Sequence, residues 1–177
     1  MKKLMSGVAV VNQLLFVFNL CIFGGLSGVG IFTAQLYGKW DNVGIRDTFR
    51  IKLYFSAVSI AVFCLLFLTK GEALISLFLH EGQENLNLAA SLKYALDYLY
   101  VMLLQMLPFA LMQVYASTLR ETGETVFPMK AGIAAVLVNI FFNYILIFGK
   151  LGFPAVEVVG AAATVIARFT ECAIVLI

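Results

Sequence analysis

Two asparagines lie inside the most apolar part of this sequence. The run from 131 to 149 contains Asn139 and Asn143, and only uncharged residues surround them. Four residues make about one turn of an α-helix, so both amides lie on the same helix face. A carboxamide oxygen can coordinate Na⁺, and its NH₂ group can donate to a substrate or to a carboxylate. The pair is therefore either part of a binding site, with Na⁺ as a candidate metal ion, or a means of holding neighbouring helices together.

A pair of opposite charges lies in the last apolar run. Arg168 and Glu171 are three residues apart, near the middle of the segment that ends at Ile177. Charged side chains at that depth of a membrane span are costly and normally face the protein interior. At this spacing the two can pair on one helix face. They form either a structural ion pair or a functional pair of charges.

The composition indicates that these residues belong to a membrane protein. Of 177 residues, 62% are hydrophobic and 12% are charged, and the mean hydropathy is +0.98. A soluble domain has about 45–50% apolar and about 25% charged residues.

The net charge of +2 argues against nucleic acid as a partner. A histidine metal cluster is excluded because His80 is the one histidine, and the distant Cys21, Cys64 and Cys172 argue against a zinc or disulfide framework.

We predict an all-α polytopic membrane protein with five transmembrane helices, because a span needs roughly 20 mostly apolar residues. The expected helices cover about 6–37, 47–68, 91–119, 128–148 and 155–177. Lys52 is assigned to the basic link after the first helix, and the run from Lys70 to Glu72 is expected to interrupt the second. Pro108 predicts a kink in the third helix.

The basic residues favour one orientation in the cell membrane only slightly. The links after the first and third helices hold six Lys and Arg residues, against five on the other side. This bias places those two links in the cytoplasm. Both ends of the chain adjoin apolar sequence, so we expect an incomplete chain.

Motifs of enzyme chemistry are not found in the sequence. It has no carboxylate pair in a common span, no P-loop and no GxSxG motif. We therefore predict that the protein is not an enzyme and uses no cofactor. A transporter without an ATP-binding motif would use an ion gradient or a partner.

Four segments carry a pattern with family-like order and spacing. They read FTAQLYGKWD, STLRETGETVFPMK, VNIFFNYILIFG and VVGAAATVIAR. The second segment contains Arg-x-x-Gly-Glu-Thr followed closely by Pro. Together these segments resemble the multidrug and toxic compound extrusion (MATE) transporter family, over essentially the whole chain.

The resemblance implies a secondary antiporter that exports organic cations and other amphipathic compounds in exchange for H⁺ or Na⁺. Members have twelve helices in two lobes, and this chain resembles helices two to six of the N-terminal lobe. The first helix, with an acidic residue central to ion coupling, and the whole second lobe would lie in the missing remainder of the transporter. The implied partners are thus the lipid bilayer, small amphipathic or cationic substrates, and that remainder.

The resemblance also implies roles for individual residues. Asn139 corresponds to an asparagine of the ion site in the N-terminal lobe. Asn143 lies where one branch of the family has Asp and another has Asn, and an amide does not titrate. Thr164 corresponds to a hydroxyl-bearing position on the sixth helix, and Gln113 to a polar position on the fourth. These four residues are the expected ion- or substrate-binding residues.

Two other functions remain open at this point. A lipid-linked oligosaccharide flippase of the same superfamily would need a basic cavity for pyrophosphate, and the interior charges here are few. An inactive, truncated membrane protein is the second alternative. A reading frame more than twice this length would favour the transporter over the truncated protein.

Overall fold

The computed structural model describes residues 2–80, 88–147 and 157–176, and these residues are almost entirely α-helical. The helices are α1 (Lys2–Gly38), α2 (Asn42–His80), α3 (Leu88–Leu103), α4 (Met106–Glu121), α5 (Val126–Ile147) and α6 (Glu157–Leu176). The all-α prediction is confirmed. The segment from 148 to 156, which contains the end of the fourth predicted helix and the start of the fifth, lies outside the described residues.

The second predicted helix was too short at both ends. Asp41 explains the early start of α2, because its Oδ1 accepts hydrogen bonds from the backbone N–H groups of Val43 (3.1 Å) and Gly44 (3.0 Å). At the other end α2 continues past Lys70 and Glu72 to His80. Both of these charged side chains are exposed, so the helix continues without burying a charge.

The third predicted helix is two helices in the structure. The chain leaves α-helical geometry between Leu103 and Met106, and α3 and α4 are inclined by 42° to each other. Pro108 lies in the first turn of α4, where a missing backbone N–H is tolerated. The predicted kink is therefore confirmed, but the helix breaks a few residues before the proline.

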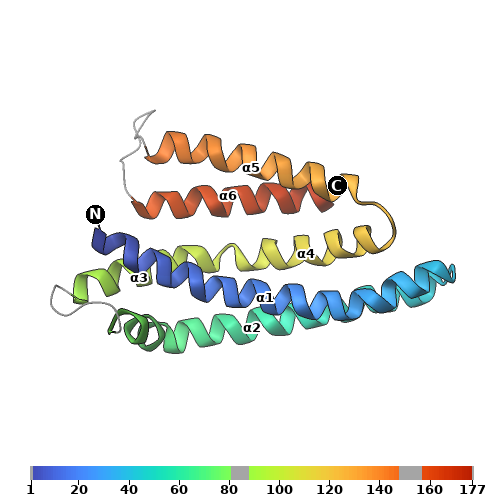
Figure 1. The fold of residues 1–177 in the computed structure, drawn as a ribbon, viewed down its shortest axis with the longest axis horizontal. Coiled ribbons are helices and arrows are strands. Elements are labelled where there is room, and N and C mark those ends of the chain that lie inside the picture. The colour runs from blue at the N-terminus through green and yellow to red at the C-terminus, as the bar shows by residue number, and fades with distance from the viewer. Residues whose placement is uncertain (1, 81–87, 148–156, 177) are drawn as a thin grey trace.

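The helices run back and forth along one long axis (Figure 1). The α1–α2 turn and the α4–α5 loop lie at one end of the molecule. The unit of α3 and α4 lies between the α1–α2 pair and the α5–α6 pair, and α4 contacts helices of both pairs. Phe18, Leu99 and Met106 contribute to the main core, which α1, α2, α3 and α4 form together.

The apolar surface fits a lipid environment. On α5, large side chains such as Leu137, Ile140 and Phe141 are exposed. Within the described residues, α1, α2 and α5 are each long and apolar enough to cross a membrane, and α3 with α4 would make a fourth span. The chain is thus an all-helical polytopic membrane protein. Because α6 is not among these spans, the count of five remains a prediction.

Candidate functional site

The two asparagines of α5 contact each other directly. Their spacing places them one turn apart, and the Nδ2 of Asn143 donates to the Oδ1 of Asn139 over 2.8 Å. Each carboxamide still has a further donor or acceptor beyond this bond. The bond fixes the orientation of Asn139, so Asn143 supports its neighbour.

Asn139 lines a cavity of about 470 Å³ between α5 and α6, which we call the α5–α6 cavity. Thr164, Arg168 and Glu171 of α6 line the same cavity. The remaining lining residues are small or aliphatic: Gly132, Ala135, Val136 and Ala167. Four of the six predicted site residues therefore meet around one space, and Asn143 touches it only through Asn139.

Arg168 and Glu171 form an ion pair on one face of α6. The Nη1 of Arg168 lies 2.8 Å from the Oε2 of Glu171, and their side chains are 35% and 10% exposed. The guanidinium also lies over the ring of Phe109 on α4, with its Cζ 5.2 Å from the ring centroid. A cation in this position is attracted to the π face of the ring. Arg168 is thus held between a carboxylate and an aromatic ring.

Gln113 does not line the α5–α6 cavity but borders two other spaces, one of them between α1 and α4. The other measures about 360 Å³ and lies between α4, the start of α5 and α6, and we call it the α4–α6 cavity. Arg168 and Glu171 line this cavity too. The Oε1 of Gln113 accepts a 3.5 Å hydrogen bond from the Nη2 of Arg120. The structure thus connects Gln113 to the other candidate residues only through the charge pair.

A third cavity adds polar residues that the sequence analysis did not single out. It measures about 210 Å³ and is lined by Asn12 and Asn19 of α1, by Gln105, and by Thr164 and Arg168. Asn12 accepts a 3.4 Å hydrogen bond from the hydroxyl of Tyr98. The spacing of seven between Asn12 and Asn19 places both on one helix face, and that pattern was available in the sequence.

The MatE family model matches residues 2–145 of this chain. The chain belongs to the MatE family. It is 32% identical over 178 residues to a probable multidrug resistance protein NorM of Thermotoga maritima, an alignment of 97% of this chain and 36% of the relative. It is also 31% identical over 156 residues to the multidrug resistance protein MdtK of Pectobacterium atrosepticum, covering 88% of this chain and 33% of MdtK. The chain thus spans about a third of the length of these relatives. No solved structure matches it significantly.

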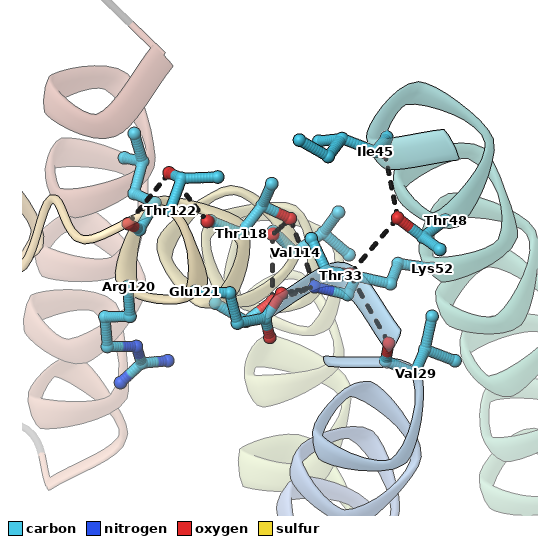
Figure 2. A network of polar contacts seen from close by, with 12 residues as sticks. Val29, Thr33, Ile45, Thr48, Lys52, Val114, Thr118, Arg120, Glu121 and Thr122 are labelled. Atoms are coloured by element: carbon cyan, nitrogen blue, oxygen red, sulfur yellow. Dashed lines mark hydrogen bonds and ion pairs between the residues drawn. The ribbon is translucent and has the colours of Figure 1, made fainter. Parts of the chain in front are cut away.

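A buried lysine is the main feature of this MatE chain that the sequence analysis missed. Lys52 was counted as a charge of a basic link, but its side chain, on α2, is 0% exposed. Its Nζ donates to the hydroxyl of Ser117 on α4 over 3.3 Å. It also donates to the hydroxyl of Thr118 (3.2 Å) and forms an ion pair with Glu121, both on α4 (Figure 2). We call Lys52, Ser117, Thr118 and Glu121 the Lys52 cluster.

A hydroxyl pair continues this polar region to α1. The Oγ1 of Thr33 donates to the Oγ1 of Thr48 over 3.1 Å, which joins α1 to α2 close to Lys52 (Figure 2). Both threonines are buried. The region therefore ties α1, α2 and α4 together at the end of the bundle where the α4–α5 loop lies.

The cavities of this MatE chain combine neutral oxygens with paired charges. Among the described residues, no group of three or more His, Cys, Asp and Glu side chains could hold a metal ion. The α5–α6 cavity instead offers the amide of Asn139, the hydroxyl of Thr164 and the carboxylate of Glu171. Such a set can bind Na⁺ through oxygens or hold a proton on Glu171, whereas the amides cannot titrate.

Proposed function

We propose that this chain is part of a membrane exporter that exchanges amphipathic or cationic compounds for H⁺ or Na⁺. Membership of the MatE family and the printed names of the multidrug resistance relatives support this activity. The observation that carries the proposal is the α5–α6 cavity, where Asn139 and Thr164 lie beside the Arg168–Glu171 pair. The chain spans about a third of the length of its relatives, so we propose this activity for the whole transporter and not for the chain alone.

Coupling requires that the ion and the compound favour different shapes of the same protein. An ion held at Asn139 or Glu171 contacts α5 and α6 together, because both helices contribute to the cavity wall. Occupancy of that site would therefore change how strongly the two helices are held together. Na⁺ would act through the neutral oxygens of Asn139 and Thr164, and H⁺ through the carboxylate of Glu171.

The flippase alternative is less well supported. A pyrophosphate group would need cations that can reach it. The two interior cations of the described residues, Lys52 and Arg168, are each paired with a carboxylate, Glu121 and Glu171 respectively. The described cavities add one further cation, Arg120, which donates to the Ala116 carbonyl and to Gln113. A single such cation is not the basic cluster that pyrophosphate needs, which favours the exporter.

The test uses the protein that carries this chain, reconstituted in vesicles with a fluorescent organic cation. A pH gradient and a Na⁺ gradient are imposed separately. We expect one of them to drive export, and we expect Asn139→Ala to lose that export because it removes an oxygen from the cavity and the partner of Asn143. The matched control is Ile140→Ala, whose side chain is 61% exposed on the next position of α5. If neither the pH gradient nor the Na⁺ gradient drives export, the proposed function is contradicted. Full export by Asn139→Ala would contradict the assigned site.

A further inference from the structure

The Lys52 cluster borders a cavity that Gln113 also lines, but that is separate from the cavity of Asn139 and Thr164. This space of about 270 Å³ lies between α1 and α4, and we call it the α1–α4 cavity. Two members of the cluster, Ser117 and Glu121, line it, together with residues of α1 such as Ser27. Glu121 is the last residue of α4, next to the α4–α5 loop. Its carboxylate therefore lies in the cavity wall nearest that loop.

A glycine of α1 provides the space for this carboxylate. Gly30 is buried, and a Cβ built there would overlap the Glu121 carboxylate. Gly28, on the same helix, has nothing within 4 Å of a Cβ built there. Gly30 therefore has a specific steric reason to lack a side chain, whereas Gly28 does not. Three helices thus meet at one ion pair: Gly30 of α1, Lys52 of α2 and Glu121 of α4.

Breaking this buried pair is costly, and the pair depends on its geometry. A fully buried ammonium without a partner is strongly destabilising, so Lys52 holds Glu121 in place as long as the carboxylate can reach it. A side chain at position 30 would push the carboxylate away from that position. Lys52 would then favour any arrangement of α1, α2 and α4 that admits water to its charge.

We propose that Gly30, Lys52 and Glu121 form a gate between the α1–α4 cavity and the buried ammonium of Lys52. The gate is closed while the carboxylate and the ammonium are in contact. Separating them lets water pass from the α1–α4 cavity to Lys52 and to the buried Ser117. The use of this gate in transport rests on the proposed function, but its opening is a property of the helices and can be measured without transport.

The test is the reaction rate of a cysteine placed behind the gate. Ser117→Cys is introduced after Cys21, Cys64 and Cys172 have been changed to alanine, in open membrane sheets that a water-soluble thiol reagent can reach from both faces. Ser117 is 9% exposed, so we expect slow labelling with the gate intact. Gly30→Ala and Glu121→Gln should each accelerate labelling about tenfold or more, as expected for the loss of a charge-assisted contact. Gly28→Ala should leave the rate unchanged.

Two measurements keep the outcome decisive. Gly30→Ala retains both charges, so it tests the gate even where Glu121→Gln impairs folding. Folding of each variant is checked by its thermal midpoint in detergent. After Glu121→Ala has removed the carboxylate, adding Gly30→Ala should give no further acceleration, because no carboxylate remains to be displaced. Labelling at the parent rate in Gly30→Ala, or full additivity with Glu121→Ala, would overturn the gate. If the unaltered protein shows no gradient-driven export in the vesicle assay, that result counts against the proposed function alone and leaves the gate untouched.

Discussion

Arg168 is the side chain at which the candidate site comes together. It lines the α5–α6 cavity, the α4–α6 cavity and the cavity of Asn12 and Asn19. The sequence predicted its pairing with Glu171, because a spacing of three within a helix is a local relation. The pairing of Lys52 with Glu121 could not be predicted in the same way, because 69 residues separate the partners and only the packing of α2 on α4 joins them. Local polar pairs were thus predictable here, and long-range ones were not.

The Arg168–Glu171 pair should not tolerate exchange of its charges. In the variant Arg168→Glu with Glu171→Arg, the spacing still allows an ion pair, but a carboxylate then lies over the Phe109 ring in place of the guanidinium. The π face repels negative charge, so we expect export to fall about tenfold, the effect of roughly 1.4 kcal/mol on a rate. The measurement is dye export in vesicles, normalised to folded protein.

The matched control for this exchange is the pair Asp47 and Arg50. It has the same spacing of three, but its side chains are 59% and 62% exposed. Exposed pairs contribute little, so exchanging these charges should leave export and thermal midpoint unchanged. Full export by the exchanged Arg168–Glu171 variant would show that the pair is only structural.

At the scale of the helices, the charged residues of α2 lie differently from what the sequence predicted. Lys70 and Glu72 predicted an interruption, but lysine and glutamate both favour the α-helix and both side chains are exposed here, so the helix continues through them. Lys52 shows the reverse error, because α4 supplies the partners for its burial. The fold class followed from composition and run length alone. The helix ends depended on contacts between helices, which the sequence does not display.

Two adjacent glycines of α1 should respond oppositely to the same substitution. A Cβ at Gly25 would overlap the ring of Phe55 on α2, whereas a Cβ at Gly24 meets nothing within 4 Å. Gly24→Ala should raise the free energy of unfolding by about 0.5–1 kcal/mol, because alanine favours the helix more than glycine does. Gly25→Ala should lower it by about 1–3 kcal/mol through overpacking against α2. Thermal unfolding in detergent measures both changes, and equal shifts of the midpoint would contradict the α1–α2 packing.

At the scale of the whole molecule, the charge count no longer decides the orientation. Lys52 was one of six basic residues counted for the links after the first and third predicted helices. It lies buried on α2, so it is not a loop charge, and the count becomes five on each side. The positive-inside rule therefore gives no preference here. The relative placement of the links comes instead from the back-and-forth course of the helices (Figure 1).

That course predicts which parts of the chain face the same side of the membrane. Trp40, in the α1–α2 turn, and Glu124, in the α4–α5 loop, lie at the same end of the bundle. After replacement of the native cysteines, Trp40→Cys and Glu124→Cys should both react with a membrane-impermeant thiol reagent in intact cells, or both react only after permeabilisation. Lys93→Cys, near the start of α3, should show the opposite behaviour, because α2 runs from the turn at Trp40 to the other end of the bundle, where α3 begins. Opposite labelling of Trp40→Cys and Glu124→Cys would mean that α2, or the unit of α3 and α4, does not cross the membrane.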